Sequence, residues 1–98
     1  MKPVVYHHAA EIEFLEAVRW CERERPGRGL RLDLLVQKAE QQIQSHPRAG
    51  RLFMRGTRRL VLPRFPYSLI YLVQADRFYV VAFAHAKRRP GYWKERLG

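Results

Sequence analysis

The spacing of hydrophobic residues predicts two helices in the first half of the chain. From about Ala9, apolar side chains recur every three or four positions, which places them on one face of an α-helix. Pro26-Gly27 ends this repeat, because proline cannot continue a helix and glycine relaxes the turn. A second helical repeat runs from about Leu30 to His46, and Pro47 closes it by disfavouring helical geometry in the residue before it. The two apolar stripes are Ala10, Phe14, Ala17, Val18 and Cys21, and then Leu32, Leu35, Val36, Ala39 and Ile43. Together they predict a helical hairpin.

The second half of the chain has the short apolar runs that are typical of β-strands. Strands are predicted at Arg58–Leu62, Ser68–Gln74 and Phe78–His85, with a further short strand at Pro3–Tyr6. The first two of the later strands are linked by a segment with two prolines, which predicts a bend, and the last two by a link of hairpin length. The runs are almost continuously apolar. We therefore expect one face to pack on the helices and the other to be only partly solvated.

The remaining segments complete the expected fold. Arg48–Gly56 is predicted to be a loop, and Pro90–Leu97 is predicted to add a last helical turn, because proline is tolerated at a helix start. A length of 98 residues allows one small domain, spanning residues 1–98. The predicted fold class is α+β: a helical hairpin packed on one face of a small antiparallel sheet, in the order β-αα-βββ with a short C-terminal helical tail.

Charge is distributed very unevenly between the two halves. Residues 1–46 carry seven Lys or Arg and seven Asp or Glu, whereas residues 47–98 carry twelve Lys or Arg and only Asp76 and Glu95. The whole net charge of +10 therefore lies on the sheet-forming half. Like charges on one face repel, so fold stability does not require this arrangement. A large field of one sign predicts an anionic partner, either nucleic acid or an acidic protein segment.

Several classes of protein are excluded or disfavoured by the composition. Cys21 is the only cysteine, which excludes an internal disulfide and a cysteine-rich zinc site. The chain has no metal, P-loop or dinucleotide motif, so we expect no cofactor and no metal. Its apolar runs are too short to cross a bilayer, and its first residues lack the pattern of a signal peptide. We expect a soluble cytoplasmic protein with no membrane partner.

Candidate chemistry gathers at the ends of the last three predicted strands. Arg58 and Arg59 begin the first of these strands on opposite faces, and His85 ends the last. Cleavage of RNA by its 2′-OH requires a proton acceptor, cations that stabilise the phosphate and a proton donor. Histidine transfers protons near neutral pH, and arginine binds phosphate with two parallel hydrogen bonds. Tyr92 and Trp93 can stack on an unpaired base.

Each of these residues also has a simpler interpretation. A single arginine, such as Arg64, is more often a solubilising group at the rim of a sheet. His85 is equally well explained as a hydrogen-bonded structural residue. Trp93 can serve only to anchor the tail to the sheet, and Trp20 is most simply packed at the helical hairpin. The cluster as a whole therefore carries more weight than any of its members.

A family resemblance extends over essentially the whole chain. It is carried by Val4–Ala10, Ala17–Trp20, Pro26–Gly29, His46–Gly50, Arg58-Arg59, Arg64–Tyr71 and Ala84–Trp93. In this order and spacing, the segments resemble the RelE/ParE superfamily of bacterial toxins from type II toxin–antitoxin modules, often labelled plasmid stabilisation proteins. The family's β-αα-βββ order agrees with the fold predicted above.

The resemblance implies a cytoplasmic growth inhibitor that an antitoxin holds inactive. Antitoxins of this kind wrap an acidic, partly disordered segment around the toxin, which suits the +10 half of this chain. The superfamily divides by target. RelE-like members cleave mRNA on the ribosome, whereas ParE-like members poison DNA gyrase and have no known hydrolytic site.

The resemblance also implies roles for individual residues. Arg59 matches a basic residue early in the first of the three strands, Lys87 and Arg88 match a basic pair after the last strand, and Tyr92 matches a tail tyrosine. RelE-like ribonucleases carry an arginine at the start of the next strand, where this chain has Ser68. His85 resembles a histidine found at this strand end in many ParE-like members.

Ser68 narrowly favours DNA gyrase over ribosome-bound mRNA as the target. The alternatives are a ribosome-dependent endoribonuclease, a non-catalytic nucleic-acid-binding module and a degenerate toxin. If the protein is an enzyme, we expect a metal-independent endoribonuclease. The candidate catalytic residues are Arg59, His85, Arg88 and Tyr92, and the candidate target-binding residues are Arg58, Arg64, Lys87, Arg89 and Trp93.

Overall fold

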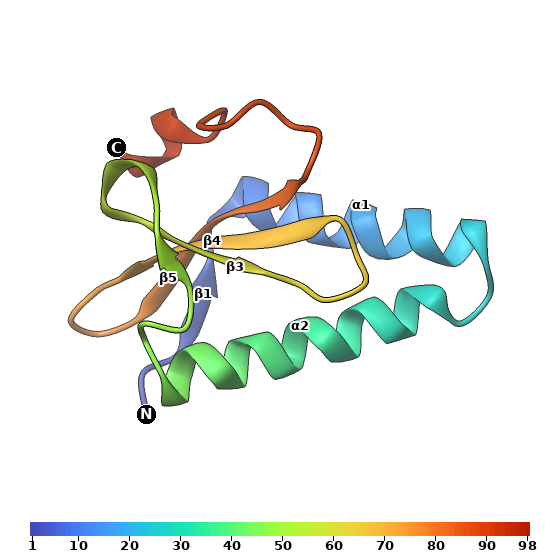
Figure 1. The fold of residues 1–98 in the computed structure, drawn as a ribbon, viewed down its shortest axis with the longest axis horizontal. Helices are drawn as coiled ribbons and strands as arrows, with labels where there is room; N and C mark the ends of the chain where they lie inside the picture. The colour runs from blue at the N-terminus through green and yellow to red at the C-terminus, as the bar shows by residue number, and fades with distance from the viewer.

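Two helices lie against one face of a five-stranded sheet in the computed structural model, which describes residues 1–98 (Figure 1). The elements in chain order are β1 (Val4–Tyr6), α1 (His8–Glu24), α2 (Arg28–Ser45), β2 (Arg51–Leu52), β3 (Arg58–Val61), β4 (Tyr67–Val73) and β5 (Phe78–His85), with 3₁₀ helices η1 (Met54–Gly56) and η2 (Lys94–Leu97). The predicted α+β class, helical hairpin and β-αα-βββ order are confirmed. Neither helix combines the length and apolar character that crossing a membrane would require.

Local hydrogen bonds explain where the hairpin helices begin. The His7 side chain caps α1, because its Nδ1 accepts a hydrogen bond of 3.0 Å from the Ala9 N–H. The Glu22 carboxylate reaches across the turn and accepts hydrogen bonds from the N–H groups of Gly27 and Gly29. It thus occupies the amino end of α2, where unpaired N–H groups favour an anion.

The sheet has the order β1-β5-β4-β3-β2 and is mixed. Strands β3, β4 and β5 are antiparallel neighbours, as predicted. Strand β1 joins the edge of β5 in parallel, which is possible because the long helical connection carries the chain back across the sheet. The predicted loop Arg48–Gly56 also contains structure. Its residues Arg51 and Leu52 form β2, which pairs with the start of β3, and the loop ends in η1.

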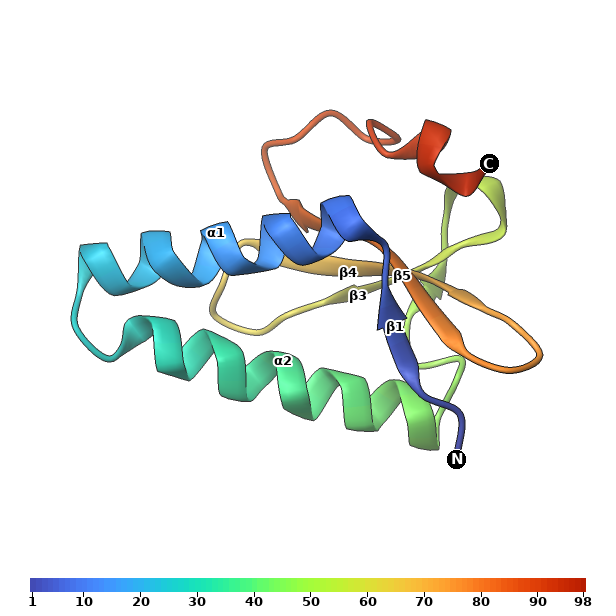
Figure 2. The same cartoon turned by 180° about the vertical axis from the view of Figure 1, so that it is seen from behind.

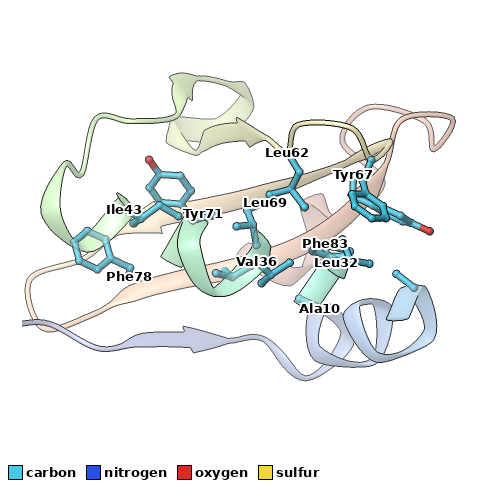
Figure 3. Close-up of a cluster of buried hydrophobic side chains, with 14 of the residues drawn as sticks. Ala10, Leu32, Val36, Ile43, Leu62, Tyr67, Leu69, Tyr71, Phe78 and Phe83 are labelled. Atoms are coloured by element: carbon cyan, nitrogen blue, oxygen red, sulfur yellow. The ribbon is translucent and has the colours of Figure 1, made fainter. Parts of the chain in front are cut away.

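The main core lies between α2 and the facing side of the sheet. Four of the five residues of the predicted α2 stripe are buried and Leu35 is half-buried. Figure 3 shows Leu32, Val36 and Ile43 of this stripe among aromatic and aliphatic side chains of β4 and β5. The core residues labelled there are Ala10, Leu32, Val36, Ile43, Leu62, Tyr67, Leu69, Tyr71, Phe78 and Phe83. Trp20 was expected at the hairpin, but this prediction is wrong. Its side chain is 53% exposed, since Ala17 and Cys21 occupy the buried face of α1.

The C-terminal tail, residues 86–98, covers the opposite face of the sheet. In Figures 1 and 2 the tail lies on one side of the sheet and α2 on the other. Trp93 packs there on Ile70, Val81 and Ala82, which form a second core. This confirms that neither face of the sheet is fully solvated. The helical turn begins at Lys94 rather than at Pro90, because Gly91 has a φ of 79° and interrupts helical geometry.

A buried tyrosine joins the loop after α2 to the sheet. The Tyr71 hydroxyl accepts a hydrogen bond of 2.9 Å from the Gly50 N–H and donates one of 2.9 Å to the Pro47 carbonyl. The contact is close, since a Cβ on Gly50 would lie 2.9 Å from the Tyr71 ring. Burial raises the pKa of Tyr71, so the phenol remains a neutral donor.

Replacing Tyr71 with phenylalanine tests this connection. Tyr71→Phe leaves the buried Gly50 N–H without an acceptor, so we expect the free energy of unfolding to fall by about 1–3 kcal/mol in urea denaturation. Tyr79→Phe is the control, because the Tyr79 hydroxyl makes no hydrogen bond to the protein, and it should change the value by less than about 0.5 kcal/mol. Equal effects of the two changes would contradict the assignment.

Candidate functional site

Six of the nine predicted site residues line one hollow between the sheet and the tail. The hollow measures about 140 Å³, and we call it the tail hollow. The predicted residues that line it are Arg59, His85, Arg88, Arg89, Tyr92 and Trp93, together with Ser68. No carboxylate lines the tail hollow, so its arginines make it positively charged.

Strand alternation places Arg59 at this site. Arg59 pairs with Ile70 and lies on the tail side of β3, whereas its neighbour Arg58 points to the helix side. The Nε of Arg59 donates a hydrogen bond of 3.3 Å to the hydroxyl of Ser68, and its guanidinium lies 5.6 Å from the centre of the Phe53 ring. Ser68 therefore positions Arg59, and the guanidinium keeps its remaining donors free for an anion.

His85 marks the end of β5 and the border between the two faces of the sheet. Its ring meets the Tyr67 ring edge-on, with centroids 5.1 Å apart. Its Nδ1 accepts a hydrogen bond of 3.0 Å from the Lys87 N–H, so the neutral ring carries its proton on Nε2. His85 and Arg88 also line a shallow hollow on the side of α1. In this arrangement His85 offers a hydrogen-bond donor, since Nδ1 is already occupied.

Tyr92 is held by its neighbours in a neutral state. The guanidinium of Arg88 lies 3.8 Å from the centre of the Tyr92 ring, and the Tyr92 hydroxyl donates a hydrogen bond of 2.9 Å to Glu13 Oε2. Burial and the Glu13 carboxylate both raise the pKa of Tyr92, so the phenol keeps its proton at neutral pH. The guanidinium of Arg96 lies 5.2 Å from the centre of the same ring, so the Tyr92 ring contacts two arginines.

Trp93 is 1% exposed and anchors the tail. Its ring contacts the second core and lies 6.2 Å from the Phe53 ring. The indole is therefore enclosed by the protein and has no free face for a base.

Three predicted residues lie away from the tail hollow. The Nη1 of Arg58 donates a hydrogen bond of 2.9 Å to the Gly50 carbonyl and so belongs to the loop after α2. Arg64 lies in the β3–β4 bend beside α2, at a different hollow. Lys87 is exposed, and its side chain does not line the tail hollow. Each departure follows from backbone geometry that composition does not reveal.

The sequence analysis did not identify Glu13, which supports the whole site. Its carboxylate forms a salt bridge of 2.9 Å with Arg96 and accepts hydrogen bonds from Tyr92 and from the Phe83 N–H of β5. The pKa of Arg96 is raised, chiefly by its hydrogen bonds to Glu13. One signal was present in the sequence: Glu13 lies three residues after Ala10, beside the buried stripe of α1. No group of three His, Cys, Asp or Glu side chains has the arrangement of a metal site.

Residues 4–90 match the family described as "ParE toxin of type II toxin-antitoxin system, parDE". The chain belongs to the ParE toxin family. A solved structure described as "Chromosomal ParDE TA system from P. aeruginosa" is similar, with a TM-score of 0.77 and 18% sequence identity over 89% of this chain and 98% of that chain. At this identity the likeness shows a shared fold. No curated protein matches the chain.

The ParE family assignment confirms the resemblance seen in the sequence. In this ParE fold, most of the predicted site residues line the tail hollow. Its charge and its neutral tyrosine make it suited to binding an anionic group. Glu13 and Arg96 support the tail hollow without lining it.

Removing the Glu13 carboxylate tests this support. Glu13→Ala deletes the salt bridge and leaves the Phe83 N–H without an acceptor, so we expect a loss of about 2–4 kcal/mol in the free energy of unfolding. Glu16→Ala is the matched control on the same helix, because Glu16 is exposed and makes no hydrogen bond, and it should change stability by less than about 0.5 kcal/mol. A Glu13→Ala protein as stable as the control would show that the network is not needed.

Proposed function

We propose that this ParE family member is the toxin of a type II toxin–antitoxin module, that it acts in the cytoplasm, and that its target is DNA gyrase. The family match over residues 4–90 carries the first part of this proposal. The second part rests on the tail hollow, whose arginines can bind an anionic partner while its tyrosine stays neutral. A toxin that works by binding needs no proton-transfer group at this position.

A cognate acidic antitoxin is the proposed neutralising partner. The net charge of +10 lies on the sheet-forming half, which favours an acidic segment. The outer side of the hairpin leaves large apolar side chains exposed, and such surfaces mark sites of protein contact. They are Ile12, Leu15, Trp20, Leu30 and Leu34. The similar solved structure is itself described as a ParDE system.

Two local features favour gyrase poisoning over RNA cleavage. Ser68 stands where RelE-like ribonucleases have an arginine, and here it serves to position Arg59. The raised pKa of Tyr92 and the occupied Nδ1 of His85 leave the tail hollow without an obvious proton acceptor.

A metal-independent endoribonuclease of the RelE-like kind is the second candidate. It is favoured by one observation: Arg59, Arg88 and Arg89 converge on the tail hollow beside His85. Three cations around a phosphate would stabilise the charge that develops during cleavage. A degenerate toxin predicts that induced expression leaves growth unaffected. A non-catalytic nucleic-acid-binding module predicts that no neighbouring reading frame encodes a short acidic protein.

Two parallel reactions with purified protein distinguish the targets. We expect the protein to trap gyrase–DNA breaks in a supercoiling reaction and to leave message intact in a coupled translation reaction. Addition of the cognate antitoxin should abolish the effect. Cut message with normal gyrase activity would reverse the choice of target, and inactivity in both reactions together with normal growth would contradict a toxin.

Neighbouring cations in the tail provide a matched pair of variants. Arg88→Ala removes a guanidinium that lines the tail hollow, and we expect the concentration needed for gyrase poisoning to rise about tenfold or more, because charge-assisted hydrogen bonds to a target are strong. Lys87→Ala removes the same charge one residue earlier, outside the hollow, and should have an effect of less than about threefold. Circular dichroism confirms that both variants fold. If the two variants are equally impaired, net charge matters and the tail hollow does not.

A further inference from the structure

A second cationic hollow lies where the start of α2 faces the β3–β4 bend. It measures about 440 Å³, and we call it the bend hollow. Its charged lining residues are Arg28, Arg31, Lys38 and Arg64, and its apolar lining residues are Leu35, Pro63 and Phe65. No carboxylate lines the bend hollow, and it shares no residue with the tail hollow.

None of the four cations of the bend hollow forms a salt bridge within the protein, because the only salt bridge joins Arg96 to Glu13. The guanidinium of Arg28 lies 4.7 Å from the centre of the Phe65 ring, and its Nε is buried without a hydrogen-bond acceptor. A charged side chain with a buried, unpaired donor is unfavourable, and a ligand that supplies oxygen atoms to the part of Arg28 that lines the hollow would offset this cost.

The backbone at Arg64 adds an independent observation. Arg64 has a φ of 66°, in the left-handed region that favours glycine. This conformation places the Arg64 side chain beside three other cations, although repulsion between like charges disfavours that placement. The bend brings Leu62 and Phe65 into the main core and leaves the Arg64 side chain at the hollow, and strained backbone conformations of this kind cluster at binding sites.

We propose that the bend hollow is a binding site for a phosphate group. A phosphate presents several oxygen atoms in different directions, and three guanidiniums and one ammonium can donate to them together. A carboxylate has only two oxygens and one negative charge, which would leave most of the four cations unpaired. The hollow is also larger than one phosphate needs, so a sugar, a base or the next phosphodiester fits beside it.

This inference goes beyond the proposed function, because it requires neither an antitoxin nor gyrase. It is tested on the isolated protein by two-dimensional NMR titration with two probes, inorganic pyrophosphate and a short single-stranded oligonucleotide. The arginine side-chain resonances report directly on the hollow. Binding by pyrophosphate alone would assign a small phosphate ligand, and tighter binding by the oligonucleotide would assign a nucleic-acid backbone.

The decisive comparison uses two double variants of equal net charge. Arg31→Gln with Arg64→Gly removes two cations of the bend hollow, and glycine suits the backbone at position 64, so the fold should be retained. Arg19→Gln with Arg23→Gln removes two exposed cations from α1, outside the hollow. We expect the first pair to weaken phosphate binding about tenfold or more and the second by less than about twofold.

Three results would overturn the proposal. The first is equal weakening by the two double variants, which would indicate a non-specific field. The second is a set of resonance shifts centred on the tail hollow rather than on Arg28. The third is tighter binding by a glutamate-rich peptide of matched charge than by either phosphate probe, which would assign the hollow to an acidic protein segment.

Discussion

The fold depends on hydrogen bonds to the backbone of β5 beyond the point where its neighbour β1 ends. β1 pairs only with Phe78, Tyr79 and Val80, so the later part of β5 has β4 on one side and no strand on the other. Glu13 accepts a hydrogen bond from the Phe83 N–H, and Arg96 donates one to the Val81 carbonyl. An unpaired strand edge invites association with other chains. Two oppositely charged side chains, themselves joined in a salt bridge, satisfy the backbone that a further strand would otherwise pair with.

The same network determines the shape of the tail hollow. Because Arg96 and Tyr92 both bind Glu13, the tail is drawn back against α1 after it crosses the sheet. Trp93 then fills the second core, and Arg88 rests on the Tyr92 ring. Arg88, which lines the tail hollow, is thus positioned through Tyr92 by a carboxylate on the first helix. The fold thus holds three arginines around a hollow that no carboxylate lines, while Glu13 fixes the tail from outside it.

The sequence predicted the elements better than it predicted their contacts. Strand β5 was predicted with its observed bounds, because a long apolar run between turn residues depends only on local pattern. The parallel pairing of β1 depends on the path of the whole chain, and β2 is too short to leave a pattern. The convergence at His85 followed from hairpin connectivity. Other placements arise from contacts between residues far apart in the sequence. Arg58 and Arg64 lie on other surfaces, and Glu13 binds the tail.

We propose that the two cationic hollows are separate binding surfaces for anionic groups. The tail hollow is the smaller of the two, and in it Arg88 rests on the Tyr92 ring. The bend hollow is larger, and one of its lining residues, Arg28, has a buried Nε without a hydrogen-bond acceptor. The tail hollow is formed by the half of the chain that carries the net charge, and the bend hollow lies where that half meets α2.

Amide hydrogen exchange at Phe83 tests the central claim most directly. If Glu13 closes the edge of β5, the Phe83 amide is protected in the native protein as strongly as the paired amides of β4. In the Glu13→Ala protein, which has no acceptor at this position, its protection should fall much further than that of the β4 amides. Rapid exchange at Phe83 in the native protein, or protection that Glu13→Ala leaves unchanged, would contradict the claim that this carboxylate holds the edge and the tail in place.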